Sequence, residues 1–142
     1  MTRIDFYILP DNESIQPLEY TCRMVEKVRN LDQRIYIHLS NGEASRRLDE
    51  LLWNHKPESF LPHEFAREGG NPGQIVLGHD QLPEGHDDIM INLSGQVPPF
   101  FSRFKRVVEI VPGGKNDRVK RRENFRRYKD RGYHMNTHNI RS

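Results

Sequence analysis

Residues 106–131 read RVVEIVPGGKNDRVKRRENFRRYKDR: an apolar run, a Pro-Gly-Gly break and a long basic segment. The run from Arg106 to Val111 predicts a buried β-strand, and Pro112-Gly113-Gly114 ends it. The basic segment then predicts a helix over about 115–132. Because a strand that leads directly into a helix is the repeating unit of α/β folds, this stretch indicates an α/β architecture.

Apolar runs at 4–9, 34–39, 75–78 and 89–93 predict four further strands. A helix with a broad apolar face follows Pro17, which suits a first helical turn. A second helix runs over 43–53, and Ser40 and Glu43 are spaced as a capping box before it. The order β-α-β-α-β-β-(short helix)-β-α predicts one α/β domain over residues 1–142. Its expected form is a three-layer sandwich with a mostly parallel central sheet.

The net charge of +2 hides a strong asymmetry along the chain. Residues 1–102 carry 9 basic and 16 acidic side chains, a net of −7, whereas residues 103–142 carry 13 and 4, a net of +9. Nine of the cations and three acids fall within residues 115–131. A basic segment of this density binds an anionic partner or stays fully solvated, and we favour a partner.

Composition also limits the location and the chemistry. Cys22 is the single cysteine, so no internal disulfide can form, and no apolar stretch resembles a signal peptide or a membrane span. We therefore expect a cytoplasmic protein with no membrane partner. The turn after the first strand, LPDNESIQP, lacks the glycines that dinucleotide binding needs. Gly113-Gly114-Lys115 lacks the remaining features of a phosphate loop, so we expect no cofactor.

Histidine and acidic residues occur together at places that could form metal or catalytic sites. His79-Asp80 and His86-Asp87-Asp88 are interpreted as parts of a solvated loop, because no second cluster supports a metal site. His134 and His138 have helical i, i+4 spacing but no third ligand. Cys22 lies on the apolar face of a helix, where a packed thiol is the expected role. The sequence predicts no catalytic residue and no metal ligand.

The predicted C-terminal helix gathers its charges on one side. At 100° per residue, Arg122 lies 40° and Arg126 80° from Arg118, and Phe125 lies at −20°. Three guanidinium groups and one aromatic ring therefore share an arc of about 100°. Such a surface suits a ligand that offers carboxylates beside an apolar side chain. A single strand of nucleic acid would also suit arginines and an aromatic ring, so both readings stay open.

Six segments, in order and spread over nearly the whole chain, resemble the chi subunit family of bacterial DNA polymerase III. They are FYIL near the start, RLDELLW at 47–53, ESFLPHEF at 58–65, DIMINL at 88–93, VVEIVP at 107–112 and RRYKDRGYHMNT at 126–137. The resemblance implies a Rossmann-like fold without nucleotide chemistry. It also implies an accessory subunit of the polymerase that is not an enzyme by itself.

Chi proteins bind the acidic C-terminal tail of single-stranded DNA-binding protein (SSB), which ends in a phenylalanine carboxylate. Carried over by position, the tail-binding residues are Val111, Arg118, Arg122, Phe125 and Arg126. Arg122 is expected to hold the terminal carboxylate. The family commonly has tyrosine in place of Phe125 and lysine in place of Arg118 and Arg126, so positive charge is kept while a hydroxyl is lost.

A second surface is expected at the end of the helix over 43–53. Ala44, Leu48, Leu51 and Leu52 form its inward stripe, and Trp53 lies about 140° from Leu48, off that stripe. Phe60 follows in a proline-flanked loop. The resemblance implies that Trp53 and Phe60 bind the psi subunit, which links chi to the clamp loader, or alternatively a DinG-related helicase. The function expected is thus a replisome adaptor that reaches DNA through SSB, with direct binding of single-stranded nucleic acid as the alternative.

Overall fold

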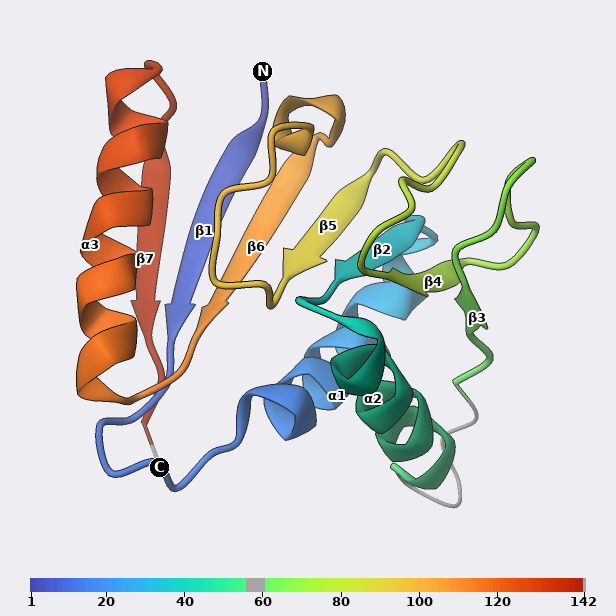
Figure 1. Ribbon diagram of the computed structural model, residues 1–142, viewed down its shortest axis with the longest axis horizontal. Helices are drawn as coiled ribbons and strands as arrows, with labels where there is room; N and C mark the ends of the chain where they lie inside the picture. The colour runs from blue at the N-terminus through green and yellow to red at the C-terminus, as the bar shows by residue number, and fades with distance from the viewer. Residues whose placement is uncertain (56–60, 142) are drawn as a thin grey trace.

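The computed structural model describes residues 1–55 and 61–141, which form a parallel sheet flanked by helices (Figure 1). The strands are β1 (Arg3–Ile8), β2 (Ile35–His38), β3 (Glu64–Phe65), β4 (Ile75–Gly78), β5 (Ile89–Asn92), β6 (Arg106–Val111) and β7 (Met135–Asn139). The α-helices are α1 (Pro17–Val28), α2 (Gly42–Asn54) and α3 (Lys115–Asp130), and the short 3-10 helices are η1 (Arg29–Leu31) and η2 (Phe101–Arg103).

The seven strands lie in the order β3-β4-β2-β5-β6-β1-β7, and every described pairing is parallel. Helices α1 and α2 pack on one face, and α3 and η2 pack on the other. In Figure 1, α3 lies at the β7 and β1 side of the sheet, away from α1 and α2. The predicted three-layer α/β sandwich with a parallel central sheet is therefore confirmed.

Strand β6 illustrates why the central strands read as continuous apolar runs. Val107 and Val111 belong to the core beneath α3, whereas Val108 and Ile110 belong to the core beneath α1 and α2. Since both faces are covered, side chains of both alternations are mostly apolar, and Glu109 is a buried polar exception on this strand. Cys22 is buried in the second of these cores, as expected for a packed thiol.

The five strands expected from apolar runs are all present, and β4 and β6 have the expected bounds. Strands β3 and β7 were not predicted. Both are sheet edges, and β7 has the sequence MNTHN, with only one apolar residue. An edge strand with one open side needs no continuous apolar run, so the sequence carried little signal for it.

The capping of α2 differs from the prediction by one residue. Asn41, rather than Ser40, is the N-cap, and its side-chain oxygen accepts a hydrogen bond from the Ala44 amide at 2.9 Å. Serine and asparagine both suit an N-cap. Because α2 begins at Gly42, its third residue is Ala44, and the residue three positions before Ala44 is Asn41. Pro17 occupies the first position of α1, as expected.

Glycine is required where β6 turns into α3. A Cβ at Gly113 would collide with the Pro10 carbonyl oxygen, because the turn after β1 packs directly against this one. At Gly114 a Cβ would lie 2.8 Å from a carboxylate oxygen of Asp117. The Pro-Gly-Gly segment therefore does more than end β6. Its glycines allow the turn after β1 and the turn after β6 to pack closely at the start of α3.

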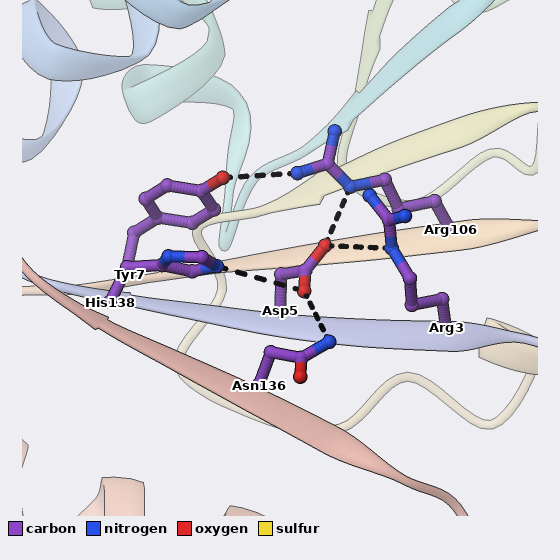
Figure 2. A network of polar contacts seen from close by, with 6 residues as sticks. All are labelled: Arg3, Asp5, Tyr7, Arg106, Asn136 and His138. Carbon is purple, nitrogen blue, oxygen red and sulfur yellow. Dashed lines mark hydrogen bonds and ion pairs between the residues drawn. The ribbon is translucent and has the colours of Figure 1, made fainter.

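A buried carboxylate fixes the position of the edge strand β7 (Figure 2). Asp5 on β1 accepts hydrogen bonds from Arg106 on β6 at 2.7 Å, from Arg3 at 3.2 Å and from Asn136 on β7 at 3.1 Å. Burial alone would raise the pKa of Asp5, but these donors and the two guanidinium charges hold it below its ordinary value. Three neighbouring strands are thereby tied together on the face opposite α3.

Candidate functional site

Helix α3 turns one aromatic side toward the sheet and most of its cations toward solvent. Tyr128 is fully buried, and Phe125 is half-buried with its ring 5.6 Å from that of Phe6 on β1. Arg122 and Arg126 are exposed. The helix is thus anchored through two rings while the guanidinium groups beside them remain available to a ligand.

A groove of about 450 Å³ runs between α3 and the strands β1 and β7. Its lining combines apolar side chains with cations and one hydroxyl: Phe6, Ile8, Arg121, Arg122, Phe125, Arg126, Lys129 and Thr137. Within residues 1–55 and 61–141, neither Arg122 nor Arg126 forms an ion pair with a carboxylate. The groove can therefore hold an apolar group on its floor and an anion at its rim.

Two buried guanidinium nitrogens on this helix lack hydrogen-bond partners in the described residues. The Nε atoms of Arg118 and Arg121 are buried and have no hydrogen-bond partner in the described part of the chain. A buried donor without an acceptor costs free energy, and of these two residues Arg121 lines the groove. The electrostatic character of the groove is that of a site for a negatively charged ligand.

Three of the five residues expected in the tail site meet in this groove: Arg122, Phe125 and Arg126. Arg118 lies nearer the start of the helix, half-exposed, with its guanidinium 3.8 Å from the Asp11 carboxylate. Val111 is buried on β6 and lines a separate small cavity. The structure thus leaves those two residues outside the groove lining.

Sequence reasoning missed the floor and the far wall of the groove. Phe6 and Ile8 come from β1, and Thr137 comes from β7, which pairs with β1 at the sheet edge. Helical periodicity can group residues of one helix but cannot say which strands lie beneath it. Lys129 could have been found by the same periodicity, since it follows Arg122 by seven residues.

A buried polar cluster holds α3 on the sheet. The hydroxyl of Tyr128 donates to the Glu109 carboxylate at 2.9 Å, and the Asn92 side-chain amide donates to both oxygens of that carboxylate at 2.7 and 2.9 Å. Glu109 is 5% exposed, and burial raises its pKa to about 7 in spite of these donors. The contact between Tyr128 and Glu109, which holds α3 on the sheet, is therefore titratable.

The second predicted surface contains one described residue, Trp53, because Phe60 lies outside the described residues. Trp53 at the end of α2 is 52% exposed, so it lies off the buried leucine stripe as expected. Its ring lies 4.5 Å from that of His63. His63 is held in turn by the Asp49 carboxylate at 2.8 Å and by the Leu61 carbonyl oxygen at 2.7 Å. The exposed indole therefore packs against a histidine ring whose position is fixed by two polar contacts.

The histidine, acidic and cysteine residues considered as metal or catalytic candidates have structural roles or do not cluster in the described residues. Nε2 of the buried His86 lies 2.7 Å from the Gly73 carbonyl oxygen, so this ring braces a loop rather than facing solvent. No group of three or more His, Cys, Asp or Glu side chains is placed to hold a metal ion in the described residues. Burial raises the pKa of the Cys22 thiol to about 11. None of the helices described here is long and apolar enough to cross a membrane.

Comparison with known proteins assigns the chain. The sequence profile described as DNA polymerase III chi subunit, HolC, matches residues 1–136. The chain belongs to the chi subunit family of DNA polymerase III. It is 34% identical over 140 residues to the DNA polymerase III subunit chi of Pseudomonas aeruginosa, covering 99% of this chain and 98% of that protein. The chi subunit of Escherichia coli is 28% identical over 144 residues, covering 96% and 97%.

Membership of this family makes the chain a component of DNA replication that associates with the polymerase III complex. A third relative, the chi subunit of Haemophilus influenzae, is 26% identical over 139 residues and covers 95% of each chain. Among solved structures, the crystal structure of T4 UvsW aligns with a TM-score of 0.63 at 10% identity, over 97% of this chain and 41% of that chain. At that identity the likeness concerns the fold alone.

Proposed function

We propose that this chi-family chain is a non-catalytic replisome adaptor. Its groove beside α3 binds the acidic C-terminal tail of SSB, and its Trp53 surface binds the psi subunit. Through psi, the chain links SSB-coated DNA to the clamp loader. The observation that carries this proposal is the groove itself, in which the apolar floor of Phe6, Ile8 and Phe125 adjoins exposed cations.

The chemistry of the tail matches the groove group by group. A C-terminal phenylalanine offers one ring and one carboxylate, and the acids before it add further negative charge. The ring fits the half-buried Phe125, whose own ring packs against that of Phe6 with the two planes tilted by 55°. Arg122 and Arg126 lie one helical turn apart on the same face, so a carboxylate between them can be held by charge-assisted bonds.

The Trp53 surface is suited to a protein partner because an exposed indole is a frequent hot spot of interfaces. The Trp53 surface and the groove lie on opposite faces of the sheet, because α2 packs on one face and α3 on the other. This separation favours simultaneous binding of two partners. A DinG-related helicase is the alternative occupant of the Trp53 surface. The chain belongs to a family of polymerase III subunits and has two separate candidate surfaces. Together these two features support an adaptor role.

The direct test is a titration of the full chain with a peptide that copies the SSB tail. A matched peptide that lacks only the terminal phenylalanine serves as the control. We expect saturable binding of the first peptide and at least about tenfold weaker binding of the second, because the ring is lost and the terminal carboxylate moves back by one residue. Equal binding of both peptides would mean that the groove reads charge alone and would contradict the proposal.

A further inference from the structure

Strand β7 is an open edge of the sheet. It comes last in the strand order, and β1 is its partner along the described chain. Its residues Thr137, His138 and Asn139 are exposed. An open edge of this kind presents unpaired backbone donors and acceptors to a passing extended chain.

The register of β1 and β7 identifies the groups that remain open. The Ile140 amide donates to the Ile8 carbonyl oxygen at 2.9 Å, and the strands run parallel. In a parallel pair, the amide and carbonyl of one residue point to the same side, and those of the next residue point to the other side. Asn136 and His138 therefore bond to β1, whereas Thr137 and Asn139 direct their backbone groups away from the sheet. Nothing in residues 1–55 and 61–141 pairs with these outward groups.

The usual protection of an edge is missing from β7. Its sequence MNTHN contains no proline and no lysine, and its register with β1 runs without a bulge. Residues 131–142 contain Arg131, Arg141 and two histidines but no acid. An acidic strand would therefore meet no like charge on this segment.

The edge and the groove are continuous. The side chain of Thr137 lines the groove beside Arg126 and Lys129, while its backbone amide faces the open edge. A peptide whose C-terminal ring lies on Phe125 has its preceding residues within reach of β7. The Asp5 network, which bonds Asn136, holds the strand in register without help from a ligand (Figure 2).

We propose that the acidic peptide bound in the groove continues along β7 as an added strand. Its main chain pairs with the amide and carbonyl groups of Thr137 and Asn139, and its acids face the basic rim of α3. This inference rests on the proposed tail binding and specifies how the bound tail lies. Main-chain pairing would give affinity along the tail, and the groove would give selectivity for the terminal phenylalanine.

Amide hydrogen exchange tests the inference with an internal control. In the isotopically labelled full chain, saturation with the SSB-tail peptide should slow exchange at Thr137 and Asn139 by at least about tenfold, because those amides gain acceptors. Asn136 and His138 should change far less, since their amides already bond to β1. Peptide binding is read in the same samples from the resonance shifts of Arg122 and Phe125.

The outcomes separate the two claims. Shifts at α3 with protection of Thr137 and Asn139 support the added strand. Shifts at α3 without that protection overturn it and leave tail binding intact. A peptide that shifts neither element overturns the proposed function itself.

Peptides with one methylated backbone nitrogen provide an independent check. Methylation removes an amide donor and blocks pairing, so alternate positions of the tail should differ in their response. Methylation on the side facing β7 should weaken binding by about tenfold, the effect of roughly one net hydrogen bond, and methylation at the next residue should not. Equal effects at neighbouring positions would overturn the added strand.

Discussion

The hydroxyl of Tyr128 on α3 and the carboxylate of Glu109 on β6 form a hydrogen bond of 2.9 Å in the interior of the protein. This bond joins the helix that lines the groove to the strand that precedes it. Because α3 is otherwise strongly charged and has Tyr128 as its buried residue, the contact carries much of the attachment of the helix to the sheet.

Replacing Tyr128 by phenylalanine should destabilise the fold by about 1–3 kcal/mol, because a buried carboxylate oxygen loses its donor while the ring remains. Denaturant unfolding of the two proteins measures the difference. Tyr133→Phe is the matched control, since Tyr133 packs on Phe101 with ring centroids 4.9 Å apart and its hydroxyl forms no hydrogen bond within the described chain. Equal losses in both variants would show that the bond contributes nothing specific.

Stability should fall as pH rises from about 4.5 to about 7. Burial raises the pKa of Glu109 from 4.5 to about 7, so the folded state favours the protonated carboxyl. The contribution of this group is complete below about pH 4.5 and is lost as pH rises through about 7. At about 1.4 kcal/mol per pKa unit, the loss is on the order of 3 kcal/mol.

The variant Glu109→Gln isolates this effect from other titrating groups. Its stability relative to the unmodified chain should increase between about pH 4.5 and pH 7 and then level off, since glutamine does not ionise. Unfolding free energies at several pH values measure that difference. A constant difference across the range would mean that Glu109 titrates normally.

The fold could be predicted from the sequence where two covered faces impose apolar runs, as in β4 and β6. It could not be predicted at β7, because the polar side chains of this strand are stabilised by residues far away in the sequence. Asn136, for example, bonds to Asp5, 131 residues away in the sequence. Such a contact has no local signature, and the strand it supports forms one wall of the groove.

The site was predictable to the extent that it lies on a single helix. Periodicity grouped Arg122, Phe125 and Arg126, and all three line the groove. Phe6 and Ile8 required knowledge that β1 inserts between β6 and β7. Arg118 shares the helical arc but turns toward Asp11, because the turn after β1 packs against the start of α3.

Trp53→Ala should weaken psi binding by about 2 kcal/mol or more if the indole is a hot spot, and Phe60→Ala should act similarly. Binding of the tail peptide should survive both changes, because the groove uses other elements. Leu31→Ala is the control, since Leu31 is an exposed apolar residue elsewhere, at 62% exposure. Loss of psi binding in that control would point to a general rather than a local effect.

The fluorescence of Trp53 gives an independent measure of the same surface, because it is the single tryptophan of the chain. With half of its surface exposed, its emission in the free protein should be solvent-like and should shift to the blue when psi binds. An emission already blue-shifted in the free chain and unchanged by psi would remove Trp53 from the interface.

Salt dependence distinguishes the adaptor from a direct binder of single-stranded DNA. Each phosphate contact on a single strand should cost about 0.7 log units of affinity per log unit of salt. We expect weak binding of bare DNA at physiological salt and clear binding once full-length SSB coats the strand. Removal of the SSB tail should abolish it. Tight binding of bare DNA that excess tail peptide leaves unchanged would favour the alternative function.

The most direct test of tail binding in the groove compares two arginines of one helix. Arg122 lines the groove, whereas Arg127 is equally charged and exposed but lies outside its lining. In titrations with the SSB-tail peptide, Arg122→Ala should weaken binding by about 1.5–3 kcal/mol, the range for hydrogen bonds to charged groups. Arg127→Ala should change it by much less, and both variants should keep the melting temperature. Equal losses in the two variants, or unchanged affinity in Arg122→Ala, would contradict a tail site in this groove.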